Sequence, residues 1–272
     1  MKKLSVLMVL LFGAASLSAG SGLSGSDFSL SASVKYSSEY VFRGRRAGFK
    51  VLASRVEAGC PVFDECNLYV GADFALPIQK SAAFLFGDYH ASPYVGISYD
   101  ITDVFALDFG YIHRFYTDYP TRVYNNETNG GIPSFMKRDM SEAYVGISAN
   151  MMLSPALYLF YNFDQRGIVI EGSIGHSYDL SPHSVEGLSF DLGLKVGYNR
   201  TEKVFGHEMH TLGSPHYVYF NANADIVYSV SENAKAKVGV ACAANSAKRD
   251  SWVRGSEPNK FIWFNATVDC SF

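Results

Sequence analysis

Apolar and polar residues alternate along most of this chain, and residues 29–44 show the pattern first. Every second position is mainly apolar and ends in aromatic side chains: Leu30, Ala32, Val34, Tyr36, Ser38, Tyr40 and Phe42. The intervening positions carry Lys35, Glu39 and Arg43 among serines. Because successive side chains of a β-strand point to opposite faces, the stretch predicts a strand with one apolar and one polar face. It is longer than the usual strand of a soluble sheet, which has about 5–6 residues.

The same pattern recurs about twelve times, and the connections between the predicted strands alternate in length. Connections after even-numbered strands are short, around 101–103, 152–155 and 231–233, whereas those after odd-numbered strands include the three longest loops, 117–137, 200–215 and 245–259. We therefore predict an all-β fold, a transmembrane antiparallel up-and-down β-barrel over residues 21–272, with short periplasmic turns and longer external loops. A soluble β-sandwich is the alternative, but its strands would be shorter and its polar faces richer in Lys, Glu and Thr.

Composition and termini support a bacterial outer-membrane location. Residues 1–20 predict a signal peptide, with Lys2 and Lys3 before a short apolar core and small residues at its end. No later segment has 18 consecutive apolar residues, as a membrane-spanning helix would need. The net charge of −3 provides no basic field for nucleic acid. The predicted partners are outer-membrane lipid and, during biogenesis, the barrel assembly machinery, and the oligomeric state is open, a homo-oligomer being one alternative.

Charged side chains fall on the polar faces of the predicted strands. A Lys or Arg that faced lipid at mid-depth would cost about 2–4 kcal/mol, so we expect these charges to line the lumen. They either form a solvated, salt-bridged lining or select the solutes that pass. The candidates are Lys35, Glu39, Arg43, Arg55, Glu57, Asp73, Asp88, Asp108, Arg114, Glu142, Glu171, Asp191, Lys195, Asp225, Lys235 and Lys237.

The cysteines and histidines are the candidates for disulfide, metal and catalytic chemistry. Cys60 and Cys66 flank a turn-like spacer, which predicts a disulfide in an exported protein, whereas Cys242 and Cys270 either pair or remain as free thiols facing the apolar side. The segment 207–216 holds three of the seven histidines. His207 and His210 are three residues apart and could share one helical turn, but no third ligand has a firm spacing from them, so we predict no metal site. No Ser–His pair and no phosphate-binding loop can be placed, so we predict no cofactor and no enzymatic activity.

The segment Ser37–Gly44, SSEYVFRG, resembles the first strand of the TorF-type porins of bacterial outer membranes. In that family an acidic residue, an aromatic residue and then Phe-Arg-Gly close the strand. The resemblance implies a channel-like outer-membrane protein without catalytic residues. At this position we expect Gly44 to make the turn, Arg43 to anchor at the polar rim, and Tyr40 and Phe42 to belong to the external aromatic girdle. The chain departs from the family at Arg45 and Arg46, where Ser or Gln is usual.

Two functions follow from these observations. The first is a porin-like channel through which small polar solutes diffuse passively past a charged lumen. The alternative is a structural or adhesive barrel that transports nothing because its lumen is occluded. By analogy with general porins, we expect the third external loop, 117–137, to fold inward as the constriction.

Overall fold

The computed structural model describes residues 28–78, 89–117, 139–181, 185–201, 203–204, 207–208, 216–247 and 259–272. The predicted signal peptide, the lumen candidate Asp88 and residues 118–137 of the predicted inward loop lie outside the described residues. Within the described ranges, no helix is both long and apolar enough to cross a membrane.

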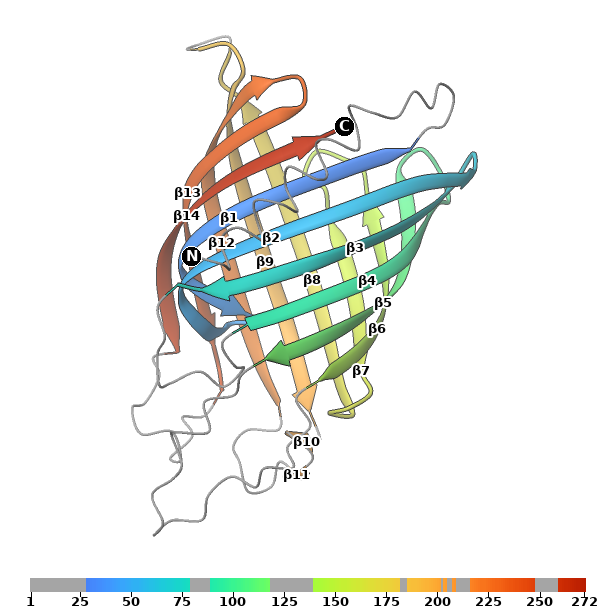
Figure 1. Ribbon diagram of the computed structural model, residues 1–272, viewed down its shortest axis with the longest axis vertical. Helices are drawn as coiled ribbons and strands as arrows, with labels where there is room; N and C mark the ends of the chain where they lie inside the picture. Colours follow the sequence, from blue (N-terminus) through green and yellow to red (C-terminus); the bar gives the residue numbers. More distant parts are fainter. Residues whose placement is uncertain are drawn as a thin grey trace.

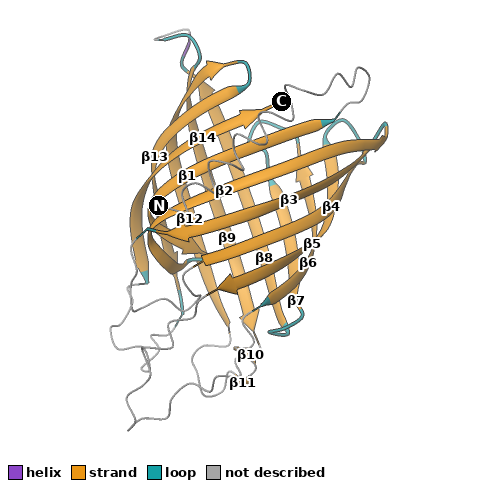
Figure 2. Ribbon diagram, viewed as in Figure 1, coloured by secondary structure: helices purple, strands orange, loops and turns teal. Residues whose placement is uncertain are grey.

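Twelve strands form a closed antiparallel barrel (Figure 1; Figure 2), as the alternation predicts. Each strand pairs with its neighbours in chain order, and β1 closes the barrel against β14. Two further short strands form a separate two-stranded sheet in the connection after β9. The strands are β1 (Ser29–Phe42), β2 (Arg45–Phe63), β3 (Cys66–Pro77), β4 (Tyr89–Asp100), β5 (Phe105–Thr117), β6 (Met140–Ala149), β7 (Ala156–Asn162), β8 (Gly167–Asp179), β9 (Leu188–Thr201), β10 (Lys203–Val204), β11 (His207–Glu208), β12 (His216–Ser231), β13 (Ala234–Asn245) and β14 (Lys260–Ser271).

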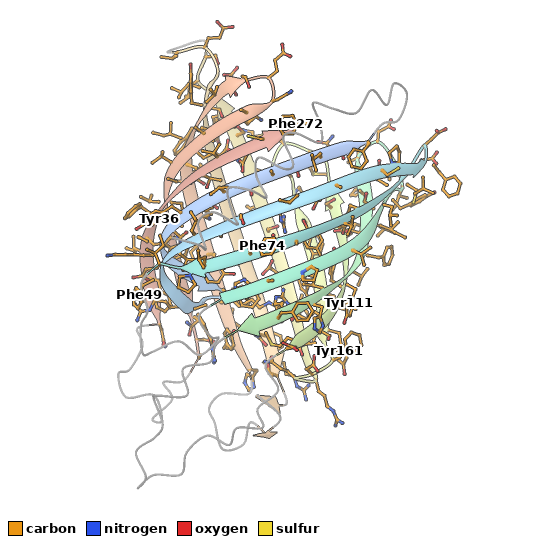
Figure 3. The ribbon with its side chains drawn as sticks, viewed as in Figure 1. Tyr36, Phe49, Phe74, Tyr111, Tyr161 and Phe272 are labelled. Atoms are coloured by element: carbon orange, nitrogen blue, oxygen red, sulfur yellow. The ribbon has the colours of Figure 1, made fainter. Side chains whose placement is uncertain are left out.

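The outer surface of the barrel is apolar, as a wall in contact with hydrocarbon requires. The apolar positions of the alternation are exposed on the isolated chain, for example Val70, Ile97, Phe109 and Ile226. Figure 3 shows aromatic side chains such as Tyr111 on this surface. Backbone groups in hydrocarbon must be paired, and closure of the sheet leaves no unpaired edge.

One end of the barrel carries the start of β1, the end of β14 and several short turns. The turns between β2 and β3 and between β12 and β13 have two residues each, 64–65 and 232–233. At the same end, Phe272 and Leu30 exchange two backbone hydrogen bonds of 2.8 and 3.0 Å. This end is the periplasmic one, and the connections at the opposite end are the external ones.

The structure corrects the predicted disulfide between Cys60 and Cys66, because both residues are free thiols. The spacer between them extends β2 and β3 instead of forming a wide turn. Cys60 pairs with Leu68 across the hairpin, and Cys66 pairs with Phe63, so the two cysteines lie at different levels of the ladder. A disulfide needs Cα atoms within about 7 Å, which this register does not provide. Cys242 and Cys270 are also free, in agreement with the second of the two alternatives.

Candidate functional site

The external end of the β1–β2 hairpin leaves the barrel wall. β1 pairs with β14 only as far as Ser37, opposite Asn265. β2 begins its pairing with β3 only at Val51, opposite Pro77. Between these points, residues 38–50 form strand pairs only with each other. We call residues 38–50 the hairpin tip.

Local backbone features explain the bend of the hairpin tip. Tyr40 pairs with Gly48 and Val41 pairs with Arg46, so Ala47 is an extra residue that forms a β-bulge. The turn itself has two residues, Arg43 with a φ of 49° and Gly44 with a φ of 72°. Positive φ at both positions is the type I′ geometry of a tight hairpin. Figure 1 shows the joined ends of β1 and β2 turning behind the front wall, and Phe49 of the tip lies far from Phe272 in Figure 3.

Arg43 reaches the opposite part of the wall from the hairpin tip. Its guanidinium donates two hydrogen bonds to Glu142 on β6, with Nη1–Oε1 at 2.6 Å and Nη2–Oε2 at 3.1 Å. Arg114 on β5 donates to the same carboxylate, whose side chain is 0 % exposed. Following the wall, β6 is the fifth strand from β1 by the shorter route. The prediction that Arg43 anchors at the polar rim is therefore wrong, because its guanidinium is bonded to a buried carboxylate on β6.

The hairpin tip also contacts the wall on its other side. Asn245 on β13 donates a 2.6 Å hydrogen bond to the carbonyl of Gly44. A side chain at position 44 would collide with Tyr219 on β12, so the close approach requires glycine. The guanidinium of Arg45 lies 4.4 Å from the ring centre of Tyr217, also on β12. The tip is thus held between two parts of the wall.

Tyr40, which the sequence places in the external aromatic girdle, contacts the inner face of the barrel wall. Its hydroxyl lies 3.4 Å from Nε2 of His90, on the inner face of β4. The alternation predicts that Tyr40 faces lipid, but a strand that leaves the wall takes both of its faces into the lumen. The expected girdle position of Tyr40 is therefore wrong.

A repeated three-residue arrangement lines the lumen wall. In each repeat a carboxylate, a glycine and a tyrosine lie side by side on three successive strands, and the tyrosine covers the glycine and donates to the carboxylate beyond it. We call these the acid–Gly–Tyr rows. They are Glu57–Gly71–Tyr94 on β2, β3 and β4, Asp108–Gly146–Tyr158 on β5, β6 and β7, and Glu171–Gly197–Tyr219 on β8, β9 and β12.

The geometry of the rows places the tyrosine rings flat against the wall. The hydroxyl–carboxylate distances are 2.7 Å for Tyr94, 3.0 Å for Tyr158 and 2.5 Å for Tyr219. A Cβ atom on the glycine of each row would overlap the ring above it. Because glycine has no side chain, the tyrosine ring can lie directly over it. The rings and the carboxylates therefore both stay close to the barrel wall.

Asp108 also accepts a hydrogen bond from a second tyrosine, which lies on the opposite side of it from Tyr158 along the wall. Tyr69 on β3 donates to Asp108 at 2.5 Å while its ring covers Gly96 on β4. The hydroxyl of Tyr69 is also 2.5 Å from that of Tyr144 on β6. Buried or half-buried carboxylates are stabilised when several donors satisfy their lone pairs, and Asp108 has this arrangement.

Other predicted lumen residues form pairs between neighbouring strands. Arg55 bonds Asp73 at 2.7 Å, Lys195 bonds Glu171 at 2.6 Å, and Lys237 bonds Asp269 at 3.0 Å. In the hairpin tip, Glu39 lies 3.7 Å from Arg46. In the strand register, Asp191 lies opposite Asp225, Lys235 lies opposite Asp269, and Lys35 lies opposite Thr267. Whether these residues line a conduction path stays a prediction.

Sequence reasoning missed the tyrosines as site residues, although it placed most of them on polar faces. The signal was present: Tyr69 and Tyr144 occupy polar positions of the alternation in strands that also carry glycines, and Tyr158 occupies a polar position in the strand after Gly146. In the described residues no group of three or more His, Cys, Asp and Glu side chains could hold a metal ion. The absence of a catalytic site stays a prediction.

Of the comparisons with known proteins, the one with solved structures finds matches. No family model and no curated protein matches the chain. Among solved structures, an outer-membrane channel from Pseudomonas putida F1 is similar, with a TM-score of 0.50, 9% identity and coverage of 91% of this chain and 96% of that one. LpxR from Salmonella typhimurium (TM-score 0.49, 10% identity) and a KdgM porin (0.47, 14%) are also similar, each over 89% of this chain and 99% of the other.

The chain is a bacterial outer-membrane β-barrel. The closed twelve-stranded topology decides this, and the likeness to the Pseudomonas putida channel supports the fold alone at 9% identity. The resemblance to the TorF-type porins, which rests on residues 37–44, stays a prediction.

Proposed function

We propose that this barrel is a porin-like channel for small polar solutes, and that the hairpin tip forms its constriction. The observation that carries the proposal is the contrast between contacts that follow the wall and contacts that cross the lumen. Tyr69, Tyr94, Tyr158 and Tyr219 bond carboxylates two strands away along the wall. Arg43 instead crosses from the tip to Glu142.

The wall contacts favour a channel over an occluded scaffold. A barrel closed by its own side chains would direct long polar groups toward the axis, where they could interlock. Here the tyrosine rings lie over glycines, and their hydroxyls hold the carboxylates at the wall. Among the described residues, the element that leaves the wall and enters the lumen is the hairpin tip, which continues from the wall as one hairpin.

The constriction differs in origin from the one that the sequence predicted. We expected loop 117–137 to fold inward, and most of that loop lies outside the described residues. The tip takes this role in our proposal because it is shared between β1 and β2, contacts β6 on one side and β12 and β13 on the other, and ends in a charged side chain.

Single-channel conductance in planar lipid bilayers tests the proposal. The informative variant replaces Glu39–Phe49 with Asn-Gly, which joins Ser38 to Lys50 through a favoured two-residue hairpin turn. The wild-type protein should give discrete conductance steps, and the variant should give steps that are several-fold larger because the constriction is gone.

Two outcomes would contradict the proposal in different ways. If the folded variant and the wild type have equal conductance, the tip is not the constriction. If neither folded protein conducts, the channel function itself is wrong and the occluded barrel is the better description. Folding of both proteins is checked by their mobility in gels before and after heating. A matched control replaces Tyr161, on the outer surface, with Phe and should leave the conductance unchanged.

A further inference from the structure

We propose that the hairpin tip is an oxyanion-binding site that makes the channel select small anions carrying carboxylate or phosphate groups. This inference rests on the proposed channel function and adds the class of solute to it. The rest of the lumen carries charges of both signs, in pairs such as Arg55–Asp73 and Lys195–Glu171. The tip and the residues that hold it carry an excess of positive charge.

The excess can be counted from the contacts. Glu39 is paired with Arg46, which leaves no net charge. Arg43 and Arg114 share one carboxylate, that of Glu142, so this cluster has one positive charge in excess. Within the described ranges, Arg45 and Lys50 of the tip have no carboxylate partner and add one positive charge each, so the tip and its docking site carry three positive charges that no acid neutralises.

Arg45 is the side chain best placed to meet a solute. It is half-buried, and its guanidinium lies 4.4 Å from the ring centre of Tyr217, whose side chain is buried. Stacking on an aromatic ring fixes the plane of a guanidinium without using its N–H donors. Among the described residues its N–H donors have no hydrogen-bond partner and are available to a ligand, in contrast to those of Arg43, which are bonded to Glu142.

The chemistry of the group identifies the class of ligand. A guanidinium presents N–H donors in a planar fork that matches carboxylate and phosphate oxygens. A surplus of positive charge at the narrowest point of a low-dielectric pore raises the local concentration of anions and opposes cations. Carboxylates and phosphates share this chemistry, and the experiment separates them.

Reversal potentials across a bilayer with a tenfold KCl gradient measure the selectivity. The wild-type channel should prefer chloride to potassium by about threefold or more, Arg45→Lys should keep the preference, and Arg45→Glu should abolish or reverse it. Malonate and inorganic phosphate, each added to the external side, should reduce the chloride current of the wild type. The same additions should have a several-fold weaker effect on Arg45→Glu. The stronger blocker of the two identifies the preferred oxyanion.

Lys260→Glu provides the matched control, because it makes the same change of charge at the same end of the barrel. Lys260 is exposed and pairs in register with Ala244, on the outer face. This variant should keep the wild-type selectivity. If it shifts the reversal potential as much as Arg45→Glu does, general surface charge explains the effect and the site is refuted.

The outcomes also separate this inference from the proposed function. Clear conductance with a preference for potassium, or with no preference, would overturn the anion site and leave the channel intact. Folded wild-type protein that shows no conductance would overturn the channel, and the anion site with it. Equal block of the wild type and Arg45→Glu by malonate and phosphate would show that neither anion binds at Arg45.

Discussion

The hairpin tip and the acid–Gly–Tyr rows both place charged groups inside the barrel, but they hold these groups in different ways. In the rows, each partner is fixed by strand pairing, because the three residues lie on successive hydrogen-bonded strands. In the tip, Arg43 and Glu142 are 99 residues apart and on elements that do not pair. The comparison indicates that a row is part of the wall, whereas the tip is docked against the wall by side chains.

This difference matters for function. A row cannot be disturbed without disturbing the ladder of the barrel, so it provides a lining of constant shape. The tip forms strand pairs only within itself, and its backbone ties to the wall lie at its base, where the carbonyl of Lys50 accepts from Ile78 N–H and Ser38 Oγ accepts from Phe264 N–H. Variants in the two regions should therefore change different properties: conductance and stability for the tip, and stability alone for the rows that do not contact the tip, such as Asp108–Gly146–Tyr158.

The largest effect is expected for Glu142→Gln, at the point where the tip is docked. The change removes a fully buried carboxylate that accepts hydrogen bonds from Arg43 and Arg114, and it leaves two guanidinium groups without a counter-charge. Breaking a buried ion pair in this way typically costs about 3–5 kcal/mol. Urea unfolding of the protein in lipid vesicles should show this loss, and the conductance should rise toward that of the variant without a tip.

A double-mutant cycle with Arg43→Gln isolates the contact itself. If Arg43 and Glu142 act together, the loss caused by Glu142→Gln should be smaller in the Arg43→Gln background, with a coupling energy of about 1–3 kcal/mol. Equal losses in both backgrounds would mean that the contact across the lumen contributes nothing. The tip would then be held by its other contacts, which include those of Gly44, Arg45 and Tyr40.

A smaller effect, of about 1–3 kcal/mol, is expected for Gly146→Ala in the wall. The added methyl group would overlap the ring of Tyr158, which covers Gly146 and bonds Asp108. The ring must move away, and the hydrogen bond must lengthen or break. Urea unfolding should show the loss of stability, while the single-channel conductance should stay close to the wild-type value because this row does not contact the tip.

Gly172→Ala is the matched control for this variant. Gly172 is also a glycine of a wall strand, but an added Cβ would meet only Leu157 Cδ1, at 4.0 Å. The substitution should be neutral or stabilise the protein slightly, since alanine restricts the unfolded chain more than glycine does. If Gly146→Ala and Gly172→Ala have the same effect, the covering of glycine by tyrosine has no energetic role.

The wall was largely predictable from the sequence, and the tip was not. Alternation of period two assigns each strand residue to a face, and it assigned Asp108 and Glu142 to the polar face, where each has polar hydrogen-bond partners. The same alternation continues through residues 38–42, where the strand has left the wall. A local pattern describes how side chains alternate along a strand, but it contains no information on which neighbours that strand pairs with.

The rows show a second limit of sequence reasoning. Asp108, Gly146 and Tyr158 belong to three strands, and their adjacency depends on the register of two separate strand pairings. A shift of one residue in either pairing would turn the tyrosine to the lipid side. The glycines and tyrosines could be read from the sequence, whereas their alignment required the structure. The type I′ turn at Arg43 and Gly44 was half predictable, because only Gly44 has a composition signal for positive φ.

The smallest effect is expected for Tyr158→Phe, which removes one hydroxyl group from the second row. Asp108 loses the 3.0 Å hydrogen bond from Tyr158 but keeps the bond from Tyr69, so the carboxylate stays partly satisfied. Loss of one such bond should lower the stability by about 1 kcal/mol. The ring still covers Gly146, and we therefore expect the conductance to be unchanged. Tyr161→Phe, on the outer surface, controls for the loss of a tyrosine hydroxyl from β7 and should cost less. A change in conductance with Tyr158→Phe would show that the wall, and not only the tip, determines passage, and it would remove the distinction between the two regions.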